Sequence, residues 1–79
     1  MRINVKLIAN YQSLLPAGTI GNTIELEAPA GISVLQVLTP FGVPLDDTSV
    51  IVLNGLTVDL NTPVSEGDTV AAFSAIAGG

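Results

Sequence analysis

The chain has 79 residues and a mass of 8.0 kDa, enough for one domain with a small core, and its 48% apolar and 11% charged composition favours a folded domain. It contains neither cysteine nor histidine, which excludes disulfides, zinc ligation by thiolate or imidazole, a cysteine nucleophile and a histidine general base. The net charge of -5 argues against nucleic acid or an anionic membrane surface as a partner and favours a basic protein surface.

Alternating polar and apolar residues predict two strands near the N-terminus. Residues 2–9 alternate with period two, which is typical of a strand with one buried face, and Ile8 falls on the other, more polar face. The proline and glycines of residues 10–22 predict a loop. Alternation resumes over residues 23–28, so the two strands are expected to form a hairpin.

A short helix is predicted after this hairpin. Ser33 precedes Gln36 by three residues, which is the spacing of a capping box at a helix N-terminus. Apolar residues follow at helical spacing, and Pro40 with Gly42 closes the segment, so the helix is expected over residues 33–41. A helix of this length is marginal alone and must be stabilised by packing on a sheet.

Three further strands are predicted in the second half of the chain. Residues 49–53 form a continuous apolar run, followed by Asn54 and Gly55, the strongest short signal for a type I′ hairpin turn. A short returning strand is expected over residues 56–60 and a last strand over residues 69–74.

The order of elements predicts an α+β fold in which one short helix packs on one face of a mixed sheet. The most economical arrangement is the β-grasp, or ubiquitin-like, roll, in which the first and last strands are parallel neighbours. We expect a β-grasp domain over residues 1–74 and a flexible C-terminal tail over residues 75–79. No apolar run approaches the roughly 20 residues of a membrane span, and the N-terminus lacks the pattern of a signal peptide, so a cytoplasmic location is expected.

Three short motifs carry a family resemblance. Residues 50–55 read VIVLNG, residues 67–70 read GDTV, and the chain ends in Gly78 and Gly79. Together they resemble the MoaD/ThiS sulfur-carrier family, which includes the small subunit of molybdopterin synthase and the thiamine-pathway carrier. The helix is shorter than in the molybdopterin relatives, and the stretch before the terminal glycines lacks their prolines, so the pathway stays open between the two.

The resemblance implies that the chain is a carrier and not an enzyme. An E1-like adenylyltransferase would activate the Gly79 carboxylate with ATP and Mg²⁺, and a sulfur donor would convert it to a thiocarboxylate, so the covalent sulfur on Gly79 replaces a bound cofactor. Glycine has no Cβ, so Gly78 and Gly79 suit a narrow channel, and residues 75–79 reach roughly 17 Å when extended. The acceptor implied first is molybdopterin, with molybdenum or tungsten as the metal of the cofactor, made by a synthase whose larger subunit receives the tail.

A partner-binding surface is expected around the last strand. Alternation puts Phe73 on the outward face, and the parallel pairing of first and last strands puts Ile8 beside it, with Leu56 extending the patch. An exposed apolar patch on a small domain usually marks a partner surface. The tail residues Ile76 and Ala77 are expected to contact the same partners. The alternative is that Phe73 packs over the sheet edge as peripheral core.

Three other functions remain open. The first is a thiamine-type sulfur carrier, the second a ubiquitin-like modifier whose Gly79 becomes linked to a target lysine, and the third an interaction domain with an inert tail. The acidic residues offer no further chemistry, since Asp46, Asp47, Glu66 and Asp68 lie in predicted turns at spacings that indicate no metal site.

Overall fold

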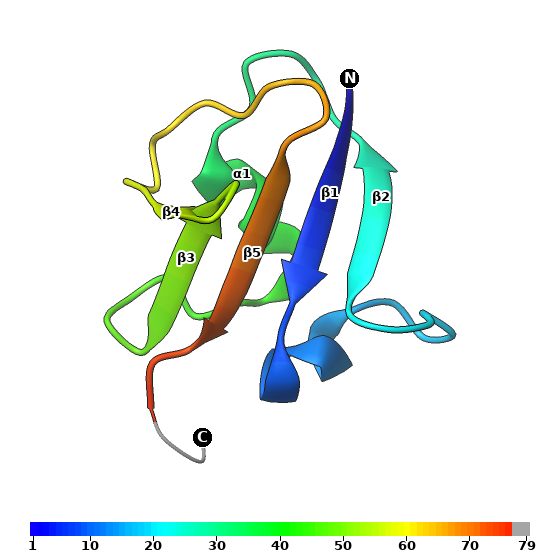
Figure 1. Ribbon diagram of the computed structural model, residues 1–79, viewed down its shortest axis with the longest axis vertical. Coiled ribbons are helices and arrows are strands. Elements are labelled where there is room, and N and C mark those ends of the chain that lie inside the picture. The colour runs from blue at the N-terminus through cyan, green and yellow to red at the C-terminus, as the bar shows by residue number, and fades with distance from the viewer. Residues whose placement is uncertain (77–79) are drawn as a thin grey trace.

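The computed structural model describes residues 1–76 and contains one five-stranded mixed sheet in the order β2-β1-β5-β3-β4, with helix α1 across one face (Figure 1). The elements are β1 (Arg2–Leu7), β2 (Thr23–Glu27), α1 (Val34–Leu38), β3 (Ser49–Leu53), β4 (Leu56–Thr57) and β5 (Thr69–Ser74), with 3-10 helices at Ala9–Leu14 and Thr39–Phe41. The predicted β-grasp fold is confirmed.

The first and last strands lie side by side and parallel in the middle of the sheet. Val5 of β1 is opposite Val70 of β5, and Leu7 is opposite Ala72. The pairs β1–β2, β3–β5 and β3–β4 are all antiparallel. Because β1 and β5 run in the same direction, the loop after β1 and the C-terminal segment after β5 leave the sheet at the same end of the molecule (Figure 1).

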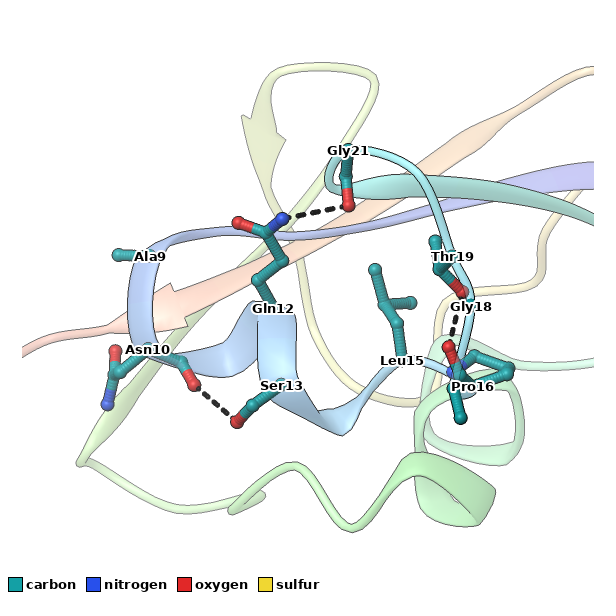
Figure 2. Close-up of a pocket in the computed structure, with 10 residues that line it drawn as sticks. Ala9, Asn10, Gln12, Ser13, Leu15, Pro16, Gly18, Thr19 and Gly21 are labelled. Carbon is teal, nitrogen blue, oxygen red and sulfur yellow. Dashed lines mark hydrogen bonds between the residues drawn. The ribbon is translucent and has the colours of Figure 1, made fainter.

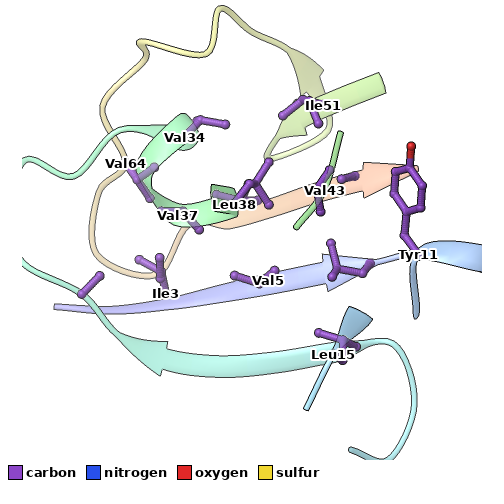
Figure 3. Packing of buried hydrophobic residues seen from close by; sticks show 14 residues of the cluster. Ile3, Val5, Tyr11, Leu15, Val34, Val37, Leu38, Val43, Ile51 and Val64 are labelled. Carbon is purple, nitrogen blue, oxygen red and sulfur yellow. The ribbon is translucent and has the colours of Figure 1, made fainter. Parts of the chain in front are cut away.

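The core lies between α1 and one face of the sheet (Figure 3). Val34, Val37 and Leu38 of the helix are buried there, against side chains of β1, β5 and β3. The fully buried side chains of largest volume are Ile3, Leu7, Leu38, Val5, Val34 and Val70. The helix leaves the other face of the sheet, called here the open face, uncovered (Figure 1).

The helix begins as predicted and ends early. The Ser33 hydroxyl accepts a hydrogen bond from the Gln36 N–H at 3.2 Å, and the Gln36 side chain accepts one from the Ser33 N–H at 2.9 Å, so the capping box is confirmed. The α-helix ends at Leu38, and a 3-10 turn then leads to Gly42, whose φ of 77° closes it. Within residues 1–76 no helix is long and apolar enough to cross a membrane.

The hairpin turn between β3 and β4 is confirmed, but β4 is shorter than expected. Asn54 and Gly55 have φ values of 51° and 84°, as a type I′ turn requires. The predicted strand over residues 56–60 ends at Thr57 because the following segment turns to the helix. The carbonyl oxygen of Leu60 accepts a hydrogen bond from the Leu35 N–H at 2.9 Å, so it satisfies a helix N-terminal donor that the helix itself leaves unpaired.

The loop predicted over residues 10–22 contains a 3-10 helix at Ala9–Leu14. Its side chains Tyr11 and Leu15 are buried in the core at the end of β1 (Figure 3). This contribution to the core was not predicted, because the partners of Tyr11 lie more than 30 residues away in the sequence.

Candidate functional site: the end of β5 and the open face

The C-terminal segment leaves the sheet beside the start of β3. The Ala75 N–H donates a hydrogen bond to the carbonyl oxygen of Thr48 at 2.8 Å, one residue past the end of β5. The next N–H, that of Ile76, donates to the Ser74 hydroxyl at 3.2 Å. Ala75 and Ile76 are exposed. The domain therefore holds the chain as far as Ala75 and presents Ile76 to solvent.

The residue that receives this hydrogen bond belongs to a firmly bonded turn. The Asp46 carboxylate accepts from the Thr48 hydroxyl at 2.5 Å and from the Thr48 N–H at 2.8 Å, and these two hydrogen bonds lower the pKa of Asp46. The Tyr11 hydroxyl lies 2.6 Å from the Ser49 hydroxyl and 3.5 Å from the Thr48 carbonyl oxygen. Asp46 thus lies in a turn, as predicted, and its carboxylate bonds locally to the residue whose carbonyl anchors the C-terminal segment.

An apolar area of the open face, called here the open-face patch, adjoins this anchor. It consists of Ile8, Val50, Val52, Ala71 and Phe73. In the register, Phe73 is opposite Val50, and Ala71 is opposite Val52. The Ile8 N–H donates to the carbonyl oxygen of Ala72 at 3.1 Å, which continues the parallel register and brings Ile8 alongside Phe73. Ala71 is buried and the other four are half-buried, so Phe73 is neither fully exposed nor a core residue.

The register places Leu56 away from this patch. Leu56 pairs with Leu53, and Leu53 pairs with the buried Val70, whose side chain faces the helix. Directly opposed residues point to the same face of a sheet, so Leu56 lies on the helix side, although it is 71% exposed. The expectation that Leu56 extends the patch with Phe73 is therefore wrong. That Leu56 contacts a partner stays a prediction, but the contact would lie on the helix side of the sheet.

Charges on the open face are paired at the end far from the patch. Arg2 lies 3.2 Å from Glu27 and 3.5 Å from Glu25, and its backbone N–H donates to both carboxylate oxygens of Glu66 at 3.1 Å. The hydrogen bond to Glu27, together with the nearby negative charges, raises the pKa of Arg2. Lys6 stands opposite Ala71 at the border of the patch and forms no ion pair within the part of the chain that the structure describes.

Asp68 has a structural role at the start of β5. Its carboxylate accepts hydrogen bonds from the Asn54 side chain at 2.9 Å and from the Ser65 N–H at 2.8 Å, which lower its pKa. Asn54 in turn accepts from the Thr69 N–H at 2.9 Å, so this network joins the hairpin turn to β5. Residues 1–76 contain no group of three His, Cys, Asp or Glu side chains that could hold a metal ion.

A pocket of about 680 Å³ lies in the loop after β1 (Figure 2). Residues of the segment 9–21 line it, and none of them carries a charge. Its polar groups bond within the loop: the Gln12 side chain donates to the Gly21 carbonyl at 2.9 Å, and the Thr19 hydroxyl donates to the Pro16 carbonyl at 2.6 Å. The pocket was not predicted. Its lining includes the hydroxyls of Ser13 and Thr19, both hydrogen-bonded within the loop, but no acidic or basic side chain that could activate them.

The remaining predicted site residues, Ala77, Gly78 and Gly79, lie outside the described residues. Of the predicted site, the structure brings together Ile8 and Phe73 on the open face and places Ile76 just beyond their end of the sheet, past the Thr48 anchor. The Thr48 anchor was missed because the sequence predicts only a turn at residues 46–48, and the residue bonded to it, Ala75, lies 27 positions further along the chain.

These features define the class of the protein: a ubiquitin-like β-grasp domain with an open sheet face beside its C-terminal segment. The ThiS family model matches residues 5–79, so the chain belongs to the ThiS family, within the MoaD/ThiS group of ubiquitin-like carriers and modifiers. This family consists of small carrier or modifier proteins rather than enzymes. No protein with a curated description matches the chain in sequence.

Solved structures share the fold over the whole chain. The crystal structure of SAMP1 from Haloferax volcanii matches with a TM-score of 0.78 and 20% identity, covering 100% of both chains. A structure of small archaeal modifier protein 1 from the same organism matches with a TM-score of 0.76 and 19% identity, covering 95% of this chain and 98% of that one. A putative molybdopterin converting factor, subunit 1, from Pyrococcus furiosus matches with a TM-score of 0.74 and 21% identity, covering 95% of this chain and 98% of that chain. At these identities the likeness shows the fold.

Proposed function

We propose that the chain is a sulfur carrier whose Gly79 carboxylate is adenylated and then thiocarboxylated, and that it donates this sulfur in molybdopterin biosynthesis. The observation that carries the proposal is the course of β5. This strand runs through the middle of the sheet, is anchored at Thr48, and directs the C-terminal segment outward beside the open-face patch. A partner that binds the patch therefore has the chain end within reach of its active site.

The chemistry requires only a main-chain carboxylate from this protein. A carboxylate oxygen of Gly79 attacks the α-phosphorus of Mg-ATP in the activating enzyme, and pyrophosphate leaves. Hydrosulfide (HS⁻) supplied by a donor then attacks the carbonyl carbon, the C–O bond to AMP breaks, and loss of the S–H proton leaves a C-terminal thiocarboxylate. Because Gly78 and Gly79 carry no Cβ, no side chain obstructs this attack. ATP and Mg²⁺ belong to the activating enzyme, and the chain itself needs no bound cofactor.

The open-face patch supplies the docking surface in this proposal. Phe73 and Ile8 would contact both the E1-like activating enzyme and the sulfur acceptor, with Ile76 and Ala77 following the tail into each active site. Lys6 at the border of the patch would meet an acidic group of the partner, while the net charge of -5 favours basic surroundings. The likeness to the Pyrococcus furiosus protein supports a larger synthase subunit as the acceptor.

A second function, protein modification, is favoured by the likeness to SAMP1, a small archaeal modifier. It shares the adenylation step, but the neutral Nζ of a target lysine attacks the activated carbonyl, AMP leaves, the amine loses a proton, and an amide is formed. A thiamine-type carrier would share the thiocarboxylate and differ in its acceptor.

A transfer assay distinguishes these functions. The thiocarboxylated protein is mixed with a molybdopterin synthase large subunit and its pterin precursor, or with a thiazole synthase and its substrates. Conversion of the pterin alone supports the proposal, and conversion by the thiazole enzyme alone contradicts the molybdopterin role. Lysine-linked conjugates in cells, abolished by deletion of Gly79, would establish modification, and no activation at all would leave the inert interaction domain.

A further inference from the structure

The outer edge of β3 is only partly covered. β4 has two residues and pairs with Val52 and Leu53 alone, so residues 49–51 have no neighbouring strand on that side. In Figure 1, β4 lies beside the end of β3 that carries the arrowhead, and the rest of that edge faces outward. An uncovered strand edge presents backbone groups that another chain can pair with.

The phase of the ladder identifies the groups on this edge. Thr48 and Asn54 are hydrogen-bonded to β5 or its flanking residue, so the even-numbered residues of β3 direct their backbone toward β5. The backbone N–H and carbonyl groups of Ser49 and Ile51 therefore point toward the uncovered edge. The Ser49 N–H donates to the backbone carbonyl oxygen of Asp46 at 3.2 Å, but the Ser49 carbonyl and the Ile51 N–H have no hydrogen-bond partner within residues 1–76. A single residue of an added parallel strand satisfies both groups, because its N–H donates to the Ser49 carbonyl and its carbonyl accepts from the Ile51 N–H.

A groove of about 330 Å³ lies along this edge. Its walls are the apolar side chains of Leu45, Val58 and Leu60, with Asp46 and Asp47 among the lining residues and no lysine or arginine. The Asp46 carboxylate is occupied by Thr48, whereas the Asp47 carboxylate has no hydrogen bond or ion pair in the described part of the chain. Val50 lines the groove and also belongs to the open-face patch, so the two surfaces are continuous.

We infer that this edge groove binds an extended segment of a partner protein, which adds a short strand to β3, places an apolar side chain between Leu45 and Val58, and sets a lysine or arginine beside Asp47. Main-chain pairing with an exposed edge is a general mode of peptide recognition, in which the backbone supplies affinity and alternate side chains supply specificity. A second copy of this chain fits less well, because it would bring two pairs of aspartates together. The inference does not depend on the sulfur chemistry of Gly79.

The test is a titration of the full-length ¹⁵N-labelled protein with the capped peptide Lys-Ile-Val-Ile-Lys. We expect saturable shifts at Ser49 and Ile51 and about tenfold slower hydrogen exchange at the Ile51 amide at saturation. The capped peptide Glu-Ile-Val-Ile-Glu should bind about tenfold more weakly, and Asp47→Lys should reverse this preference. Asp59→Lys makes the same charge change at a residue that does not line the groove, and it should keep the wild-type preference.

Three results would overturn the inference. The first is the absence of saturable shifts at β3 up to about 5 mM peptide, the weak end of specific recognition. The second is a response confined to β2, the other edge of the sheet. The third is a concentration-dependent protection of Ile51 in the protein alone, which would assign the groove to a second copy of this chain.

Discussion

The Ala75 N–H donates a 2.8 Å hydrogen bond to the Thr48 carbonyl oxygen, and Thr48 is itself held by the Asp46 carboxylate. This pairing extends the contact between the C-terminal segment and β3 one residue beyond β5. Four residues, 76–79, follow this anchor in the sequence, and four residues span roughly 13–14 Å at most when fully extended. In the proposed function, the turn at residues 46–48 therefore fixes the point from which the C-terminal segment extends into a partner.

Ala75→Pro tests this anchor, because proline lacks the N–H that donates to the Thr48 carbonyl oxygen. Ala75 is exposed, so we expect the melting temperature to change by less than about 4 °C, while the KM for activation rises several-fold and kcat changes little. Steady-state pyrophosphate release, measured at increasing concentrations of the variant, gives KM and kcat separately.

Ala30→Pro is the matched control for that variant. Ala30 precedes Gly31, whose φ is 82°, in a turn closed by a hydrogen bond from the Ile32 N–H to the Pro29 carbonyl, and proline is favoured at this turn position. This control should keep the wild-type KM. An equal rise in KM for both variants, or none for Ala75→Pro, would contradict the role of the anchor.

The Asp46 turn predicts a pH dependence of stability. Hydrogen bonds from the Thr48 hydroxyl and N–H hold the pKa of Asp46 below its ordinary value of 3.8. The folded state therefore binds fewer protons than the unfolded state as the pH falls through 3.8, so the contribution of Asp46 is present above this value and is lost below it.

Asp46→Asn should consequently flatten the acid limb of the stability curve. Urea midpoints measured from pH 7 down to about pH 2 should fall less steeply with acid than in the wild type. Asp68 remains in the variant and is shifted in the same direction, so some slope should persist. Asp47→Asn makes the same charge change at the next residue, whose carboxylate forms no hydrogen bond within residues 1–76, and it is the matched control for the loss of one negative charge.

The features predicted correctly from the sequence depend on residues close together in the chain. Ser33 and Gln36 bond across three residues, and Asn54 with Gly55 forms its turn from two adjacent positive φ values. Such elements are determined by local sterics and hydrogen bonding, so their pattern is visible in a single sequence. The parallel neighbours β1 and β5 were predicted from the order of elements rather than from any local motif.

The features that were missed depend on residues far apart in the chain. Tyr11 is fixed by contacts with Thr48 and Ser49, 37 and 38 residues away. The early end of β4 arises because the Leu60 carbonyl accepts a hydrogen bond from the helix N-terminus rather than from β3. Periodicity in the sequence does not distinguish these two partners. The side of the sheet occupied by Leu56 depended on the register, which the alternation of residues 56–60 alone left undetermined.

Packing of the helix on the sheet should dominate stability. Leu38 is fully buried, so Leu38→Ala is expected to lower the free energy of unfolding by about 2–5 kcal/mol. Leu35 lies on the same helix but is 37% exposed, and Leu35→Ala should cost less than about 1.5 kcal/mol. Urea unfolding followed by circular dichroism compares the two. Equal losses would contradict the placement of the helix.

The open-face patch should matter more for docking than for folding. Phe73 is half-buried outside the core cluster, so Phe73→Ala should weaken binding to the activating enzyme by about tenfold or more, with only a modest loss of stability. Leu56→Ala removes a more exposed apolar side chain on the other side of the sheet, and it should weaken the same binding far less. Titration calorimetry and melting curves rank the variants, and the opposite ranking would place docking on the helix side.

The central claim, that Gly79 accepts sulfur, is tested most directly by intact-mass measurement of the full chain after incubation with its activating enzyme, Mg-ATP and a sulfur donor. Replacement of one carboxylate oxygen by sulfur should raise the mass by about 16 Da, confined to the C-terminal peptide, and should require ATP. A chain lacking Gly79 should melt like the wild type and gain no mass. A wild-type chain that stays folded, is adenylated with release of pyrophosphate and still gains no sulfur would contradict the account.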